Sequence, residues 1–215
     1  MDKQDSPMNF FNKLTEQLLD GINNCMLAKI ETFDHKKMKA NVIPLVKYRN
    51  KDNSIEERPM LIEVPVSFVK AGPFVIRPPY QSGDIVLLVF ADEDIENVLF
   101  SGDISEPNSA RTHSLDDAII IGGIMPFMEG LPDEHGKDLI IANKDFSTKV
   151  VLKENGDIII QGNKVFLGNE SAIEGIPLGD TLKEWLDSHT HPAPGGVTGN
   201  PSSQSPEPSK VVKAI

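Results

Sequence analysis

The sequence predicts a mainly β protein whose helices are confined to one segment near each end of the chain. Apolar and polar residues alternate with a period of two over much of residues 26–102, as expected for strands with one buried face. A second series of short apolar runs, separated by polar turns, occupies residues 137–168. Helical spacing of apolar residues occurs before and after these two regions, which places the helices outside both.

The first segment, residues 1–25, is expected to form an amphipathic helix. Ser6 suits the N-cap and Pro7 the first helical position. Such a helix either packs on its own domain or docks on a neighbouring protein, and the sequence leaves both open. Cys25 is expected within it as a small buried residue. The apolar residues that recur at helical spacing are Phe10, Phe11, Leu14, Leu18, Leu19 and Ile22.

Residues 26–112 are expected to form a small closed barrel of the OB type. Polar turns at 50–54 and 81–84 separate the strand candidates. Five short strands joined by turns suit such a barrel, although a β-sandwich produces a similar pattern. The five strands are predicted at residues 28–33, 39–46, 60–66, 85–90 and 98–103.

Residues 113–135 are predicted to be a connector, with an apolar strand or loop at 116–123 that leads away from the barrel. Four short strands follow within residues 136–180, too few to enclose a barrel of their own. The run 158–160 is apolar on both faces, so a single sheet cannot bury it. Three chains wound together can bury it and also hide their strand edges, which predicts a trimeric β-helix. The four strands are predicted at 137–142, 148–153, 157–161 and 164–168.

Residues 181–215 are predicted to form a tip region. A short helix is expected to start at Asp180 or Thr181, with Leu182, Trp185, Leu186 and His189 along one face. From residue 192 to 208 the chain is rich in Pro, Ser and Gly, so no regular structure is expected there. Residues 211–215 are a possible short strand.

The most informative motif is the pair His189 and His191, which follows this helix. A His-x-His pair by itself is more often an ordinary pair of histidines than a ligand set. Its place after a repeat region, with an apolar stripe leading into it, favours metal binding. Two imidazoles cannot fill a metal's coordination sphere, whereas three copies of the chain supply six nitrogens. Imidazole suits iron, zinc, copper and nickel, but structural zinc is nearly always four-coordinate.

Composition excludes several classes of function. The chain has 215 residues and a formal net charge of −11, so nucleic acid and anionic membrane faces are not expected partners. One cysteine rules out an intrachain disulfide. The N-terminus lacks the pattern of a signal peptide, and the longest apolar run, 118–127, is too short to span a bilayer. We expect a soluble protein that is made in the cytoplasm.

Two further patterns have plain structural explanations. The aromatic residues of the barrel are expected to pack in it or against neighbours, and not to stack nucleic acid bases. The acidic run 92–96 lacks the spacing of an EF-hand loop and is expected to be a solvated turn. The aromatic residues in question are Phe33, Tyr48, Phe68, Phe74 and Tyr80.

Three stretches resemble the central spike proteins of contractile phage tails and related tail-like injection devices, of the baseplate assembly protein V type. The first two are 113–121 with Pro126 and Phe127, and 81–86 with Phe90. The most specific is Trp-Leu-Asp-Ser-His-Thr-His-Pro at 185–192, followed by Gly-Gly-Val-Thr-Gly at 195–199 and Pro201. Two departures are visible: Gly122 stands where proline is expected, and Asn200 interrupts a usual Gly-Pro-Pro.

This resemblance implies an OB-fold, a trimeric β-helix, and an apex where His189 and His191 of three chains share one iron ion. It also implies a structural protein of the virion, a homotrimer held by a baseplate hub, that pierces the envelope of the target cell. No enzyme activity is expected, because after His191 only Glu207 could add a ligand. Two alternatives stay open: a trimeric, fibre-like module that binds glycan or another receptor, and a metal-dependent hydrolase.

Overall fold

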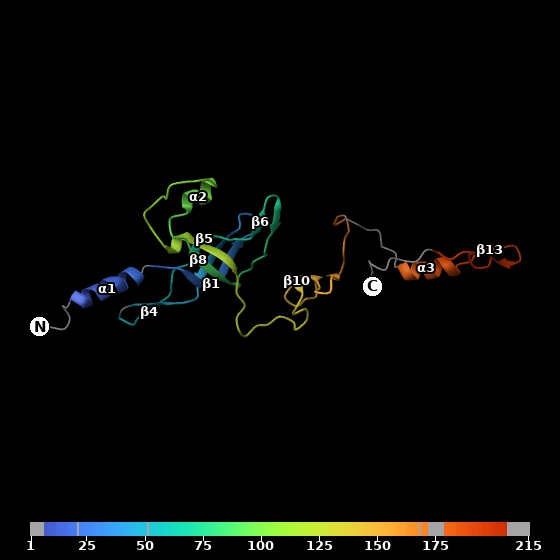
Figure 1. Ribbon diagram of the computed structural model, residues 1–215, viewed down its shortest axis with the longest axis horizontal. Coiled ribbons are helices and arrows are strands. Elements are labelled where there is room, and N and C mark those ends of the chain that lie inside the picture. Colours follow the sequence, from blue (N-terminus) through green and yellow to red (C-terminus); the bar gives the residue numbers. More distant parts are fainter. Residues whose placement is uncertain (1–6, 21, 51, 168, 172–178, 206–215) are drawn as a thin grey trace. The chain divides into compact units, whose positions relative to one another are not determined.

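The computed structural model describes residues 7–20, 22–50, 52–167, 169–171 and 179–205, the first of these ranges with side chains only to residue 15. The chain divides into two compact units, Met1–Gly130 and Leu131–Ile215. Strands dominate both units (Figure 1), and the described α-helices are α1 (Pro7–Asp20), α2 (Glu96–Ser101) and α3 (Gly179–Ser188), with a short 3-10 helix at Leu115–Asp117. The prediction of a mainly β protein is therefore confirmed.

Helix α1 is shorter than predicted. It begins at Pro7 and ends at Asp20, and the chain then enters strand β1 (Cys25–Asp34). Cys25 pairs with Val89 at the start of that strand and is exposed, so its predicted burial in a helix is wrong. Asn23 and Asn24, which favour caps and turns over helix interiors, separate the two elements. The predicted N-cap Ser6 lies outside the described residues.

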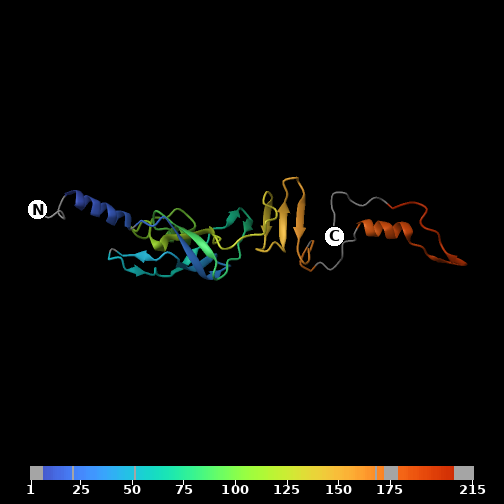
Figure 2. The same cartoon turned by 90° about the horizontal axis from the view of Figure 1, so that it is seen from below.

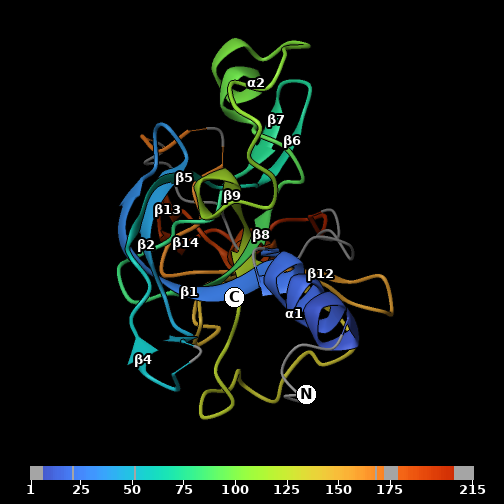
Figure 3. The ribbon, with the colours of Figure 1, turned by 90° about the vertical axis from the view of Figure 1, so that its left-hand side faces the viewer.

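The first unit contains a five-stranded sheet that curls into a half-barrel. Its strand order is β5 (Leu61–Pro65), β2 (Lys39–Pro44), β1, β8 (Ile85–Phe90) and β9 (Ala118–Gly123). All neighbours in this sheet are antiparallel, and Figure 3 shows the strands curving around a common interior. A parallel bridge between Val66 and Ile120 brings the two ends of the sheet together.

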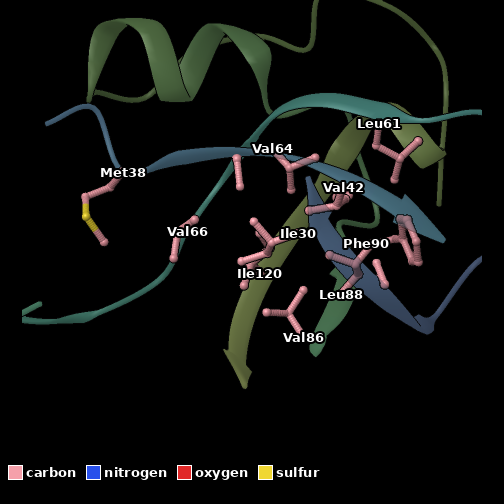
Figure 4. Close-up of a cluster of buried hydrophobic side chains, with 13 residues drawn as sticks. Ile30, Met38, Val42, Leu61, Val64, Val66, Val86, Leu88, Phe90 and Ile120 are labelled. Carbon is pink, nitrogen blue, oxygen red and sulfur yellow. The ribbon is translucent and has the colours of Figure 1, made fainter. Parts of the chain in front are cut away.

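The core of this unit follows from the period-two pattern. Along β2 and β8 each second residue is buried, and β1 contributes Ala28 and Ile30 from its centre. Because alternate side chains of a strand point to the same face, these residues converge on one interior, as Figure 4 shows. The cluster comprises Ala28, Ile30, Met38, Ala40, Val42, Leu61, Val64, Val66, Val86, Leu88, Phe90, Ala118 and Ile120.

The fifth strand lies elsewhere than predicted. Residues 98–103, predicted to be a strand, belong mostly to α2, which ends at Gly102 in the left-handed conformation with φ 72°. The fifth strand is β9, in the stretch 116–123 that was expected to lead away from the barrel. A short apolar run such as 98–100 fits a helix as well as a strand, so its period could not decide the matter.

Two small hairpins extend from this sheet. Strands β3 (Tyr48–Arg49) and β4 (Ile55–Glu56) flank the predicted turn at 50–54. Strands β6 (Val69–Ala71) and β7 (Phe74–Ile76) form a second hairpin, which the sequence did not predict.

The aromatic residues of this unit differ from one another in their packing. Phe33 packs edge-on against Tyr80 with ring centres 5.7 Å apart, whereas Phe74 is 77% exposed.

The second unit contains a three-stranded antiparallel sheet. Its strands are β10 (Leu139–Ala142), β11 (Lys149–Leu152) and β12 (Ile158–Gln161), which lie side by side in Figure 2. Three of the four predicted strands are thus confirmed. Residues 164–167 form no strand, because a strand needs a hydrogen-bonded neighbour and the described residues offer none beside them. Residue 168 lies outside the described residues.

The C-terminal part contains more regular structure than predicted. After α3, strands β13 (Pro192–Ala193) and β14 (Gly196–Val197) pair as a short hairpin within the region expected to be irregular. Pro194 and Gly195 form its turn, and Gly195 and the first strand residue Gly196 have φ values of 95° and 154°, which residues with a Cβ rarely adopt. The possible strand at 211–215 lies outside the described residues.

Candidate functional site

The two predicted metal ligands lie directly after helix α3. The N–H of His189 donates to the carbonyl of Trp185 at 2.9 Å, so the helical hydrogen bonding continues to this histidine. The imidazole of His189 stacks on the Trp185 ring with centres 4.8 Å apart and an interplanar angle of 12°. The helix thus sets both the position and the plane of the first imidazole, as its i, i+4 spacing requires.

Hydrogen bonding also indicates which nitrogen of His189 is available. Its Nδ1 lies 2.8 Å from the carbonyl oxygen of Leu186. A carbonyl can only accept, so the proton is on Nδ1 and the lone pair of the neutral ring is on Nε2. Histidine ligands commonly donate their second nitrogen to a backbone carbonyl in this way. The contact therefore suits His189 to bind a metal through Nε2.

The hairpin holds His191 by its backbone. Its N–H donates to Thr198 Oγ1 at 2.8 Å, and its carbonyl accepts from the N–H of Thr198 at 2.8 Å. The rings of His189 and His191 have centres 5.1 Å apart and lie at 86° to each other. Two imidazoles that bind one ion through bonds of about 2.1 Å, with an angle of about 90° between the two bonds, have ring centres roughly 4.5 Å apart. The observed distance between the ring centres is close to this value, while the 86° describes the two ring planes and not an angle at an ion.

One chain does not complete a metal site. In the described part of the chain, no group of three or more His, Cys, Asp or Glu side chains is placed to hold an ion. Two of the other three described histidines pair with carboxylates instead: His135 Nδ1 lies 2.9 Å from Asp138, and His113 Nδ1 lies 3.7 Å from Asp92. Any ion held by the His189–His191 pair needs ligands from elsewhere, as the sequence prediction assumed.

A clamp that the sequence did not reveal closes the loop carrying the histidines. Asp187 Oδ1 accepts from the N–H of Ser205 at 2.7 Å and from its hydroxyl at 2.8 Å. Lys183 Nζ lies 2.9 Å from Asp187 Oδ2 and donates to the carbonyl of Ser205 at 3.0 Å. The N–H of Ser205, the ammonium of Lys183 and the Ser205 hydroxyl together lower the pKa of Asp187 to about 2. These contacts tie both ends of residues 188–204 to the helix.

The sheet of the second unit has one covered face and one bare face. Val151 at the centre of β11 is completely buried, and Phe146 and Lys149 are nearly so, with Lys149 Nζ 2.9 Å from Glu134. On the opposite face, the register aligns two rows of aliphatic residues across the strands. These six side chains are between 36% and 66% exposed: Leu139, Ile141, Val150, Leu152, Ile158 and Ile160.

A buried charge cluster lies between β8 and β9 in the first unit. Arg111 donates from Nε to Asp117 Oδ2 at 2.7 Å and lies 3.2 Å from Asp94 Oδ1, with both carboxylates almost completely buried. The hydrogen bond to Asp117 is the main cause that raises the pKa of Arg111. Ser109 and the N–H of Glu96 lower the pKa of Asp94. Asp94 was predicted to lie in a solvated turn, and this prediction is wrong. Its buried carboxylate instead anchors the segment that carries α2.

Further apolar surface is exposed in the first unit. A groove of about 1300 Å³ lies beside strand β5 and helix α2, and its lining includes Met60, Ile62, Leu99 and Phe100. Phe100 is 95% exposed. On α1, Phe10 and Phe11 are also well exposed, which agrees better with docking on a neighbour than with packing on the same domain.

Among the described helices, none combines the length and the apolar character that crossing a membrane requires.

Comparison with known proteins finds a match to the first unit. Residues 26–123 match the family model described as "Phage protein Gp138 N-terminal domain". The matched range begins one residue into β1 and ends at the last residue of β9, so it coincides with the five-stranded sheet. No curated protein matches the chain. The first unit is thus similar to a domain of a phage protein.

Proposed function

We propose that this chain is the central spike of a contractile tail baseplate, a homotrimer that pierces the envelope of the target cell. The observation that carries the proposal is the bare aliphatic face of β10, β11 and β12. A sheet with one face covered by its own chain and the other left apolar needs a partner. The incomplete ligand set of His189 and His191 calls for further copies as well.

Three copies suit both needs. If the bare faces of three sheets meet on an axis, each half-exposed aliphatic side chain contributes on the order of 1 kcal/mol, at about 25 cal/mol per Å² of apolar surface. Six such residues per chain make association strongly favourable. Strands of neighbouring copies also cover the free edges of β10 and β12, which removes an aggregation hazard. This arrangement is the intertwined β-helix that the sequence predicts.

The first unit suits the role of a base. Its strand order and the parallel bridge from Val66 to Ile120 agree with the connectivity of a closed, OB-type Greek-key barrel. The match to a phage protein's N-terminal domain covers this same sheet. Helix α1, with Phe10 and Phe11 exposed, offers a surface for a baseplate hub. In the assembled particle the chain is a virion component.

At the tip, His189 and His191 of three copies would hold one metal ion through six imidazole nitrogens. Iron fits imidazole donors in this number better than zinc, whose structural sites are four-coordinate. When bound, the ion cross-links three chain ends. No coordination position is left for a substrate, which supports a structural role and no enzyme activity. Under load from sheath contraction, slow unfolding of the tip matters more than its equilibrium stability.

A receptor-binding module is the second candidate, and it requires aromatic side chains on the β-region. Phe146 is buried, while Phe166 is 48% exposed. Within residues 136–179, the described surface therefore offers little of the aromatic lining that a glycan site uses.

Mass in solution and metal content together test the proposal. Protein purified without an affinity tag is expected to be a trimer with about one iron ion per three chains. A trimer without metal favours the receptor-binding module, and one zinc ion per chain favours a hydrolase. A monomer whose second unit is folded contradicts the proposal altogether.

A further inference from the structure

Helix α3 presents an apolar face that the described chain leaves open. Leu182, Trp185 and His189 follow one another at spacings of three and four residues, so they share one side of the helix. Leu182 is 41% exposed and Trp185 is 60% exposed. The stack of Trp185 on His189 continues this face into the histidine loop, which Figure 1 shows leading from α3 to β13.

A different face of the same helix is occupied by the chain itself. Lys183 and Asp187, one turn apart, hold Ser205 through the contacts of the clamp. At about 100° per residue, the midpoint of these two positions lies roughly 145° around the helix from the centre of the apolar face. The clamp thus fixes which side of α3 stays free: the side that carries Leu182, Trp185 and the ring of His189.

A helix of this size gains most of its stability from packing. α3 has 10 residues, and isolated helices shorter than about 12 residues are marginal in water. Its free apolar face therefore needs an occupant. Since His189 lies on that face and one chain cannot complete a metal site, the occupant that satisfies both is the same face of further copies.

We propose that the α3 helices of three copies pack against one another through Leu182 and Trp185, forming a collar directly before the histidine loop. This inference rests on the proposed trimeric spike and adds an interface to it. The collar turns the Trp185–His189 stacks of all copies toward one axis. Leu182 and Trp185 are then the contacts that join the copies at the apex. Trp185 also positions the candidate ligand His189, because the two rings stack.

Tryptophan fluorescence tests the collar, because Trp185 is the only tryptophan in the chain. The full-length protein is measured after chelation, so that bound metal cannot quench the emission. We expect a blue-shifted emission relative to the denatured chain, and several-fold weaker quenching by iodide. Leu182→Lys should bring both values close to those of exposed tryptophan, and Leu182→Ala should move them in the same direction by less.

The matched control is Glu184→Lys, which places the same side chain on α3 at a position away from the apolar face and should leave the fluorescence unchanged. If Leu182→Lys and Glu184→Lys have equal effects, the assignment of the face is wrong. The molar mass of each variant in solution is also measured by light scattering. A trimer with exposed Trp185 overturns the collar and leaves the spike standing. A monomer overturns both, and a Trp185 shielded within a monomer overturns the collar as well.

Discussion

The two larger β-sheets of this protein contain the same types of aliphatic residue but bury them differently. In the first unit the sheet curls on itself, and Ile30, Leu88 and Ile120 are fully buried. In the second unit Val151 is fully buried, while Ile158 and Ile160 on the other face remain more than half exposed. The first sheet thus buries its apolar face within one chain. The second sheet leaves one apolar face exposed, which identical copies can cover.

The largest effect is expected from a charge on the bare face. Ile160→Asp in a trimer places three carboxylates near one axis, and each buried, unpaired charge costs several kcal/mol. We expect loss of the trimer, measured by sedimentation. Gln161→Asp is the control, because it places the same carboxylate on the other face of the same strand, where Gln161 is exposed and lies opposite Lys149. A stable Ile160→Asp trimer would show that the copies associate elsewhere.

A cavity in the core of the first sheet should instead lower the free energy of unfolding of the first unit, without changing the molar mass of the assembly in solution. Leu88→Ala removes a fully buried side chain, and such changes cost about 2–5 kcal/mol. Leu27→Ala, in the strand beside it, truncates a side chain that is 36% exposed and should cost much less. Urea unfolding and amide hydrogen exchange of the first unit measure the difference. If Leu88→Ala and Leu27→Ala lowered stability equally, the assignment of Leu88 to the interior of the sheet would be wrong.

Removal of both candidate ligands sharpens the comparison at the tip. His189→Ala combined with His191→Ala should abolish bound metal and speed exchange of the loop amides, while the trimer persists. The reason is that the bare sheet face offers much more apolar surface than the loop. Metal analysis and light scattering give the result, with His113→Ala as control. Complete monomerisation would mean that the tip, and not the sheet, holds the copies together.

The smallest effect concerns acid stability of the first unit. The pKa of Asp94 is lowered from its ordinary value of 3.8, chiefly by the Ser109 hydroxyl. A carboxyl with a depressed folded pKa stabilises the fold above its unfolded pKa, and this contribution is lost as the pH falls through the folded pKa. Asp94→Asn should therefore flatten the loss of stability below about pH 4. Urea midpoints at pH 5 and pH 3 measure it, and an unchanged slope would contradict this role.

The sequence pattern predicted most strands: polar and apolar residues alternate from Lys39 to Val42, and residues 85–90 form a continuous apolar run after a polar turn. It failed at α2, where three apolar residues fit either element, and at Asp94, whose burial depends on Arg111 seventeen residues later in the chain. The clamp between Asp187 and Ser205 was equally invisible. A contact between residues that are far apart in the sequence produces no periodic pattern of residue types, so the sequence alone does not reveal it.

By itself, the sequence determined the mainly β character, the division into two β-regions, the helix before the histidines and the spacing of His189 and His191. Local alternation and helical spacing are sufficient for these features, since each depends on residues a few positions apart. The tertiary structure alone decided which strand completes the first sheet, which acidic residues are buried, and which faces of β10–β12 and α3 stay bare. Those outcomes depend on long-range packing, in which segments far apart in the chain compete for the same surface.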